Sequence, residues 1–376
     1  MVKVATATTG RRCRHAFEAA SVHANGDVVC SIIDGRGEYV LGNVHQSSLH
    51  DILRGPRAEE LRRLVVSTDD AYCRAVGKTC ALKTLPAPPG EVVDTRLRFL
   101  AIEPTTTCDL RCLSCPIRDI AGDTSWRDAY ADGGMAFAAW DITRRAKQTL
   151  ADGVQRVLPA TWLRPVPERS RAEALVLRGR MPAGRRGTLP LDVVCRVMDE
   201  AGPQVERLDF FNYGEPFLYK PLVPALRHAR QALPHAVIAI STDGQQVRPE
   251  TEAALVDERL VDCLVFSVDG VDEDTYQRYR IGGTFARAWA HLSRAAARAA
   301  GTPVRVVWQY VVFRWNDDDR HLDRARAMAA ELGVPIWFDF AHTWGRSERA
   351  PDDLRRVASN LRPFTALPGE PRQQGW

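Results

Sequence analysis

The sequence predicts an α/β fold, in which helices cover a parallel β-sheet and a small cysteine-rich segment precedes it. Three observations predict this fold. From residue 190 onward, short apolar runs typical of strands alternate with longer amphipathic runs typical of helices. A proline-rich stretch at residues 85–90 separates this part from residues 1–84, which are rich in turn signals. Nine cysteines are unevenly distributed: four precede the proline-rich stretch, three cluster after it, and two stand alone.

Changes in this pattern divide the chain into segments. Residues 1–84 form the cysteine-rich segment, and residues 85–96 form a stiff, proline-containing linker. Residues 97–345 form the α/β part. Within it, residues 117–187 break the alternation with tryptophans and many arginines, so we interpret them as an insertion and a candidate lid. Residues 346–376 form a C-terminal tail.

Two elements are predicted in the cysteine-rich segment. The Asn25-Gly26 pair is typical of a tight turn, so residues 23–30 are expected to form a hairpin that ends in a cysteine. One helix is expected over Ser48–Val66, with Ser47 or Ser48 as its N-cap.

The elements of the α/β part follow from their apolar patterns. Because parallel strands need helical crossovers, the alternation predicts helices outside a sheet that is either open or closed into a barrel. In such sheets the functional site lies at the carboxyl ends of the strands. The expected strands are Leu97–Ile102, Leu208–Asn212, Val237–Ser241, Cys263–Val268, Val304–Phe313 and Ile336–Phe340, and the expected helices are Leu191–Ala201, Pro221–Ala232, Pro249–Asp257, Phe285–Ala300 and His321–Leu332.

Composition narrows the function. The chain carries 51 Lys and Arg against 47 Asp and Glu, and this weak positive balance does not favour nucleic acid as a partner. We find neither an apolar run of the roughly 18 residues that a membrane span needs nor the apolar core of a secretory signal. The protein is therefore expected in the cytoplasm, where clustered cysteines bind metals or do chemistry more often than they form disulfides.

The cysteine triplet carries the clearest chemical signal. Cys108, Cys112 and Cys115 follow the first strand of the α/β part, on a loop at its carboxyl end. Three thiolates on a short loop can hold a [4Fe–4S] cluster and leave the fourth iron open, as a catalytic metal site requires. A structural zinc site is the alternative, but it needs a fourth ligand, and no His or Cys lies nearby in sequence to supply it.

The triplet and four later motifs resemble the radical S-adenosylmethionine (SAM) superfamily, and the string CDLRCLSCP resembles its SPASM-type members. The resemblance covers about residues 97–340 and implies a partial (β/α)6 TIM-like barrel. One departure is Ser114, where many members have an aromatic residue. The later motifs are Asn212-Tyr213-Gly214-Glu215-Pro216, Ser241–Gly244, Ser267–Gly270 and Arg280.

The resemblance implies how SAM is bound. The open iron chelates the amino and carboxylate groups of SAM, Glu215 accepts from the amino group, and Arg280 pairs with the carboxylate. Other residues are expected around the nucleoside, although a plain strand and turn is the alternative for residues 267–270. The full cofactor-binding set is Tyr213, Gly214, Glu215, Pro216, Ser241, Ser267, Asp269, Arg280 and Val312, with ribose near Ser241, Ser267 and Asp269 and adenine near Val312.

Residues 1–84 resemble a SPASM-type auxiliary-cluster domain. We expect one auxiliary [4Fe–4S] cluster with an electron-transfer or structural role; zinc is the alternative. Two departures are that such domains usually follow the barrel and usually carry seven cysteines. The expected ligands are Cys13, Cys30, Cys73 and Cys80.

The substrate signal lies at the ends of the last two strands. Aromatic, carboxylate, amide and imidazole groups there suit a sugar or aminocyclitol, and core packing is the alternative for the aromatics. The resemblance implies epimerisation or alcohol oxidation, with flavodoxin or ferredoxin as reductant. A peptide-modifying maturase and a non-catalytic metal-binding scaffold are the alternative functions. The candidate substrate residues are Gln309, Tyr310, Arg314, Asp339, His342 and Trp344.

Overall fold

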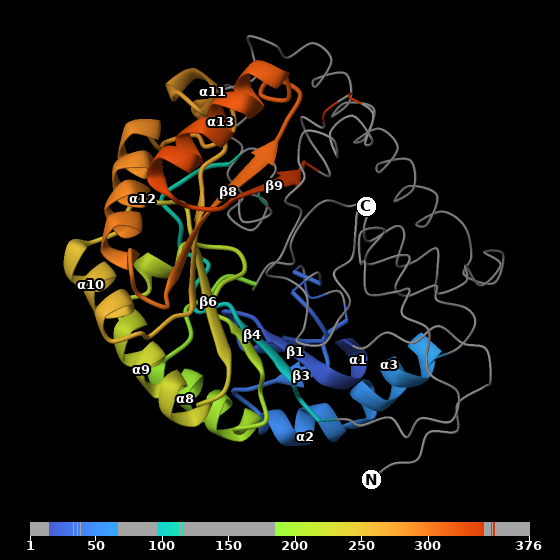
Figure 1. Cartoon of the computed structure of the whole chain (residues 1–376). Helices are drawn as coiled ribbons and strands as arrows, with labels where there is room; N and C mark the ends of the chain where they lie inside the picture. Colours follow the sequence, from blue (N-terminus) through green and yellow to red (C-terminus); the bar gives the residue numbers. More distant parts are fainter. Residues whose placement is uncertain are drawn as a thin grey trace, which may run out of the picture.

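A computed structural model describes residues 15–32, 34–35, 37, 39–66, 96–112, 115, 185–341, 347 and 349. Their strands form one nine-stranded sheet in the order β3-β2-β1-β4-β5-β6-β7-β8-β9. Figure 1 shows the helices that follow β4 in an arc along one face of this sheet. The predicted linker, insertion and tail lie outside the described residues, except for Arg96, residues 185–187, Ser347 and Arg349.

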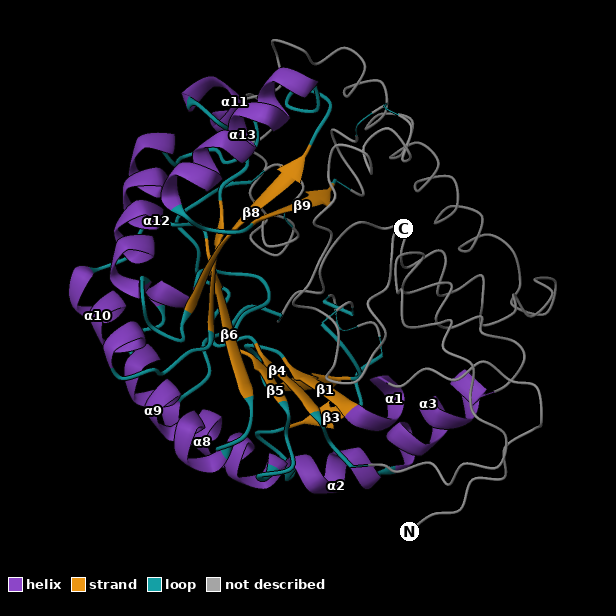
Figure 2. Cartoon of the chain, viewed as in Figure 1, coloured by secondary structure: helices purple, strands orange, loops and turns teal. Residues whose placement is uncertain are grey.

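The α/β part has the predicted parallel order. Each strand from β4 to β9 pairs in parallel with the next, so the described sheet is open and fits a partial barrel. Figure 2 shows the long helices on one side of these strands. The strands are β4 (Phe99–Ile102), β5 (Arg207–Asp209), β6 (Val237–Thr242), β7 (Cys263–Ser267), β8 (Arg305–Val312) and β9 (Ile336–Phe340), and the helices are α8 (Leu191–Ala201), α9 (Leu222–Ala232), α10 (Pro249–Asp257), α11 (Glu273–Gln277), α12 (Phe285–Ala299), α13 (Asp319–Leu332) and the 3-10 helix η3 (Pro216–Leu218).

The N-terminal module comprises α1 (His15–Glu18), β1 (Ala19–Val22), β2 (Asp27–Val29) and β3 (Gly42–Asn43) with two further helices. β1 and β2 form a hairpin around the predicted turn, which has Gly26 at φ +89°, but the hairpin begins at Ala19, before the predicted residues 23–30. β1 also pairs in parallel with β4, so this module extends the sheet of the α/β part. Local sequence patterns gave no sign of that pairing.

The single helix predicted over residues 48–66 is instead two helices, α2 (Leu49–Arg54) and α3 (Pro56–Val66). Pro56 has no backbone N–H and its ring clashes with the preceding turn, so a helix cannot run through it. Ser48 is the N-cap of α2, because its side chain accepts a hydrogen bond from the Asp51 backbone N–H at 3.1 Å.

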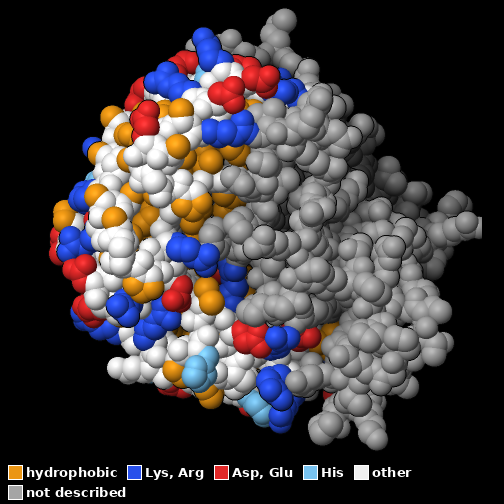
Figure 3. Space-filling model, viewed as in Figure 1, with side chains coloured by type: hydrophobic (Ala, Val, Ile, Leu, Met, Phe, Trp, Pro, Cys, Tyr) orange, Lys and Arg blue, Asp and Glu red, His pale blue; other side chains and the backbone are white. Residues whose placement is uncertain are grey.

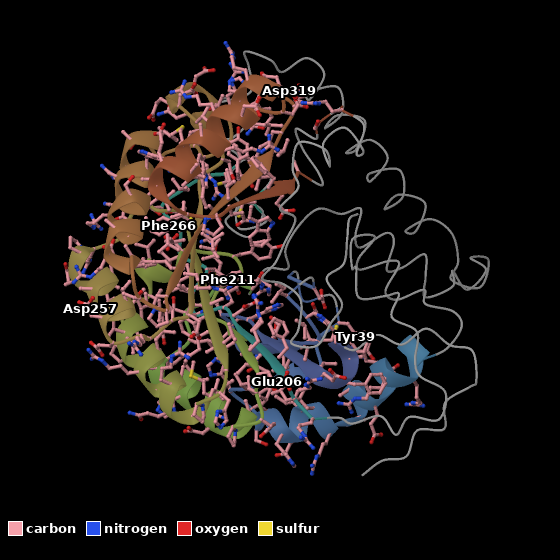
Figure 4. The ribbon with its side chains drawn as sticks, in the orientation of Figure 1. Tyr39, Glu206, Phe211, Asp257, Phe266 and Asp319 are labelled. Atoms are coloured by element: carbon pink, nitrogen blue, oxygen red, sulfur yellow. The ribbon has the colours of Figure 1, made fainter. Side chains whose placement is uncertain are left out.

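The two faces of the sheet differ in composition. Alternate residues such as Ile240, Phe266 and Trp308 pack against the helices in the main core. The opposite, concave face carries a small apolar cluster that includes Cys263 and Val265. Figure 4 shows this division: Phe266 lies toward the helices and Phe211 on the other side of the sheet.

The surface of the helix layer carries interspersed acidic and basic side chains (Figure 3). Several of them pair, for example Arg227 with Glu258 at 2.6 Å and Arg298 with Asp257 at 2.8 Å. Among the described helices, none has both the length and the apolar character that a membrane span requires.

Candidate cluster and cofactor site

The three cysteines of the triplet lie on the loop after β4, at the carboxyl end of the sheet. Cys112 is buried, whereas Cys108 and Cys115 are half-buried. The Cys115 backbone N–H donates to the Cys112 carbonyl at 3.2 Å, and the Leu110 N–H donates to the Cys108 Sγ at 3.4 Å. The loop is also tied to the segment after α11, because the Arg111 N–H donates to the Ile281 carbonyl at 2.8 Å.

The sulfur donors of this loop fit a metal cluster, although burial disfavours their charged form when no metal is bound. Burial raises the pKa of the Cys112 thiol to about 12, against the lowering effect of the Arg280 charge. Burial and the Asp243 charge raise the pKa of Cys108 as well. Because thiolates are the ligands that metals bind, a metal bound at this loop would displace the thiol protons. Three soft sulfur donors on one loop are the ligands that iron–sulfur clusters take, so the residues fit the group.

Glu215 joins the ends of β5 and β6. Its Oε1 accepts from the Phe217 N–H at 3.0 Å and the Thr242 hydroxyl at 2.9 Å, and its Oε2 accepts from the Asp243 N–H at 2.8 Å. The side chain is buried, and burial together with the Asp243 charge raises its pKa well above the ordinary value. The described residues thus supply three donors, and a carboxylate accepts about four hydrogen bonds.

Gly214 fixes where Glu215 lies. Its φ is +82°, and a Cβ at this position would collide with the Thr105 carbonyl oxygen. Only glycine combines this φ with such a close approach of two backbones at low cost. The neighbouring motif residues are also placed: Tyr213 is half-buried and its N–H donates to Glu103, while Pro216 is buried at the start of η3.

Arg280 and Asp269 form a buried ion pair beside the cysteine loop. The Arg280 Nε donates to the Asp269 Oδ2 at 2.6 Å, and its Nη1 lies 3.8 Å from the Cys112 Sγ. Burial lowers the pKa of Arg280, but the Asp269 and Cys112 charges outweigh it and raise that pKa well above the ordinary value. The guanidinium therefore remains charged next to the thiol.

Four polar side chains form a row across the concave face, on four successive strands. The Ser241 and Ser267 hydroxyl oxygens lie 3.3 Å apart, and the Ser267 hydroxyl donates to the Gln309 Oε1 at 2.8 Å. The Gln309 Nε2 donates in turn to the Asp339 Oδ2 at 3.4 Å. We call Ser241, Ser267, Gln309 and Asp339 the polar row. It brings together two residues predicted for ribose and two predicted for substrate.

Two sequence predictions need correction. Tyr310 was expected to contact the substrate, but its ring packs with Trp308 and Phe338 in the helix-facing core, and its hydroxyl donates to the Asn316 carbonyl at 3.3 Å. The side chain of Val312, expected near adenine, lies in the same core. Both follow from alternation along β8, which turns them away from the face that carries Gln309.

The remaining predicted residues lie apart from this site or outside the described structure. Arg314 is exposed, and Cys30 is half-buried directly after β2 and packs on the helix side of the sheet. The residues outside the described structure are Cys13, Cys73, Cys80, His342 and Trp344.

Sequence reasoning missed a buried junction around Glu103, the residue after β4. Its Oε2 accepts from the Ala24 N–H at 3.0 Å and from the Arg185 Nη1 at 2.9 Å, and its Oε1 accepts from the Tyr213 N–H at 3.1 Å. Arg185 also donates to the Gly35 carbonyl at 2.7 Å. The junction therefore ties the N-terminal module to the loop that carries Glu215. Its position after a strand was the only sequence signal.

Comparison with known proteins is consistent with this geometry. The family model of the radical SAM superfamily matches residues 102–325, more than half of the chain. A second model, described as an iron–sulfur cluster-binding domain and named SPASM, matches residues 13–81. None of the curated proteins matches the sequence.

Several solved structures resemble the chain at low identity. Native anSMEcpe with bound AdoMet is 15% identical, with 66% of this chain and 55% of that chain covered and a TM-score of 0.37. BtrN in complex with AdoMet and 2-DOIA is 14% identical, with 56% of each chain covered and a TM-score of 0.29. A radical SAM methyltransferase from Sphaerobacter thermophilus is 17% identical, with 48% of this chain and 56% of that chain covered and a TM-score of 0.34.

The chain thus spans a little over half of the length of each of these structures. Both matched domain types carry [4Fe–4S] clusters, and radical SAM domains bind SAM. By the extent of the superfamily match, the protein belongs to the radical SAM superfamily, with a SPASM domain at its N-terminal end.

Proposed function

We propose that this enzyme cleaves SAM reductively and removes a hydrogen atom from a sugar or aminocyclitol-like metabolite, giving epimerisation or alcohol oxidation. The observation that carries the substrate class is the polar row. Hydroxyl, amide and carboxylate groups on the concave face offer both donors and acceptors, which a substrate rich in hydroxyl or amino groups can use.

The cysteine loop and its neighbours would hold the cofactors. Cys108, Cys112 and Cys115 would ligate the cluster, which together with SAM would supply the radical chemistry for hydrogen-atom removal. Glu215 has an acceptor position left for the SAM amino group. The Nη groups of Arg280 are left for the SAM carboxylate, because its Nε is taken by Asp269.

The far end of the polar row would contact the substrate. Gln309 and Asp339 are half-buried, whereas most of the neighbouring strand residues are fully buried. Asp339 can accept from a hydroxyl or pair with an amino group, and Gln309 can fix a second hydroxyl. Ser241 and Ser267, at the other end of the row, would contact the ribose of SAM.

The two reaction outcomes differ in how the substrate radical ends. In epimerisation a separate donor such as a thiol gives a hydrogen atom to the opposite face of the substrate radical, and an electron from the reductant and a proton restore that thiol, so the substrate itself is neither oxidised nor reduced. In oxidation the radical loses a proton to a base such as Asp339 and an electron to the auxiliary cluster, which Cys13, Cys30, Cys73 and Cys80 would ligate. In both, flavodoxin or ferredoxin would supply the electron that starts SAM cleavage.

Deuterium transfer tests the proposal. Anaerobically reconstituted enzyme is given SAM, dithionite and a panel of C-deuterated nucleotide sugars, free sugars and aminocyclitols. We expect deuterium in 5′-deoxyadenosine with one class of the panel, and its loss in Gln309→Ala and Asp339→Asn. Cys112→Ala is the control that abolishes SAM cleavage. Deuterium transfer from peptides alone would refute the substrate class and favour a peptide-modifying maturase.

A further inference from the structure

We infer that Asp269 is a positioning residue for Arg280: its carboxylate anchors the guanidinium through Nε, so that Nη1 faces the cysteine loop, where it can meet the SAM carboxylate. This role replaces the ribose contact that the sequence predicted for Asp269. The inference rests on the proposed contact of Arg280 with SAM and is independent of the substrate.

The contacts of Asp269 leave little room for a direct role in ligand binding. Its side chain has no exposed surface, and its Oδ1 accepts from the Val311 N–H at 2.8 Å while its Oδ2 accepts from Arg280 at 2.6 Å. Its backbone carbonyl accepts from the Asn316 side-chain amide at 3.2 Å. Asp269 is thus held from β8 and from the loop after it, and both of its oxygens are engaged by the chain itself.

The geometry of Arg280 explains what the anchor achieves. A guanidinium carries five N–H donors in a rigid fork. Because Asp269 takes the Nε donor, rotation of the fork is restricted, and the two N–H donors of Nη1, on the side of the fork away from the Nε–H, are directed away from the carboxylate. Nη1 lies 3.8 Å from the Cys112 Sγ, which places the fork beside the cysteine loop. A long side chain without such an anchor loses rotamer freedom only on binding the ligand, which weakens binding.

The chain also contains a matched control. Asp209 is a buried aspartate on the same sheet, and it accepts from the Arg207 Nε at 2.8 Å. The pair resembles Arg280–Asp269, because in both pairs the arginine bonds through Nε and both side chains are largely buried. The exposed fractions are 8% for Arg207 and 4% for Asp209, against 14% for Arg280 and 0% for Asp269. Both of its residues belong to β5, and neither contacts the cysteine loop in the hydrogen bonds described for them. Asp209→Asn should therefore perturb folding without affecting SAM binding.

The test measures SAM affinity by the change that SAM causes in the EPR spectrum of the reduced cluster, with iron and sulfide content as a check on cluster loading. The variants are Asp269→Asn, Arg280→Gln, the double variant and Asp209→Asn. We expect Asp269→Asn and Arg280→Gln each to raise the Kd for SAM at least tenfold at normal cluster content. Asp209→Asn should leave that Kd within about twofold.

The double variant decides whether Asp269 acts through Arg280. If it does, the double variant binds SAM no more weakly than Arg280→Gln alone, because the anchor has nothing left to position. If instead the Kd of the double variant rises by the product of the two single increases, the inference is overturned and a direct contact of Asp269 with SAM is supported. A normal Kd in Asp269→Asn would also overturn it. A normal Kd in Arg280→Gln would instead refute the proposed Arg280–SAM contact.

Discussion

Replacing Glu103 with Gln should destabilise the protein far more than the loss of one charge on a surface would. All three described partners of the Glu103 carboxylate are donors: the Ala24 N–H, the Arg185 guanidinium and the Tyr213 N–H. Whichever way a glutamine amide is turned, its NH2 group faces at least one of them. The substitution also leaves Arg185 as a buried cation without its partner, since the two side chains are only 2% and 0% exposed.

The magnitude follows from these two losses. Breaking a buried ion pair on one side costs about 3–5 kcal/mol, and a buried donor without an acceptor costs about 1–3 kcal/mol, part of which is the same loss. We therefore expect the free energy of unfolding to fall by about 4 kcal/mol. With a urea m-value of about 3 kcal/mol/M, the unfolding midpoint moves by more than about 1 M.

The assay is urea unfolding of anaerobically prepared protein, followed by far-UV circular dichroism at equal iron content. Glu206→Gln is the matched control, because Glu206 pairs with Arg98 at 2.6 Å on the same sheet but both side chains are about one-third exposed, at 33% and 30%. This control should cost about 1 kcal/mol or less. If the loss in free energy of unfolding for Glu103→Gln is within about 1 kcal/mol of the loss for the control, the junction is not a buried charge pair and the reasoning is wrong.

Three further predictions concern single positions. Gly214→Ala should destabilise the protein by more than about 3 kcal/mol, because a Cβ at φ +82° is strained and would also collide with Thr105. The control Gly301→Ala, at φ +75° with nothing within 4 Å of its Cβ, should cost only about 1 kcal/mol. Equal losses of stability in the two variants would contradict the close approach of Gly214 to Thr105. Burial and the Arg185 charge hold the pKa of His23 well below 6.5, so the unfolded chain takes up the proton first and stability should fall by up to about 1.4 kcal/mol per pH unit as the pH drops below about 6.5. His23→Asn should flatten the stability profile measured by urea unfolding from about pH 7 to about pH 5, and an unchanged slope would refute this source. Tyr310→Phe should lower the free energy of unfolding by about 1 kcal/mol, because the hydrogen bond of its hydroxyl to Asn316 is lost. The KM for substrate should stay unchanged, because the side chain lies in the core. A raised KM would show that Tyr310 contacts the substrate after all.

The elements with strong local signals could be predicted from the sequence. The bounds of α10 and β9 are those expected. α13 ends at Leu332, as expected, and is followed by Gly333, whose φ of +66° is the left-handed conformation that glycine favours after a helix. The strand after α8 was expected over Leu208–Asn212 but ends at Asp209, because residues after it turn to form the loop that holds Glu215.

The residue types of the candidate site could be predicted from the sequence, but the face of the sheet on which each side chain lies and its contacts were predicted less well. Alternation alone places Gln309 and Tyr310 on opposite faces of β8, and applying it would have removed Tyr310 from the substrate set. The role of Asp269 depends on contacts with Val311 and Arg280, which lie 42 and 11 residues away in the chain. Pairings at such separations leave no periodic signal in a single sequence.

The parallel pairing of β1 with β4 has a consequence for how the protein can be divided. Four residues of β1, Ala19 to Val22, pair with Phe99 to Ile102. A truncated protein that starts after the proline-rich stretch would therefore expose the backbone donors and acceptors of β4 along a new sheet edge, and such edges recruit strands from other chains. It would also lose the Ala24 N–H, from which Glu103 accepts a hydrogen bond. The cysteine-rich segment and the α/β part are thus interdependent for solubility, and fragments made at the proline-rich stretch between them should aggregate.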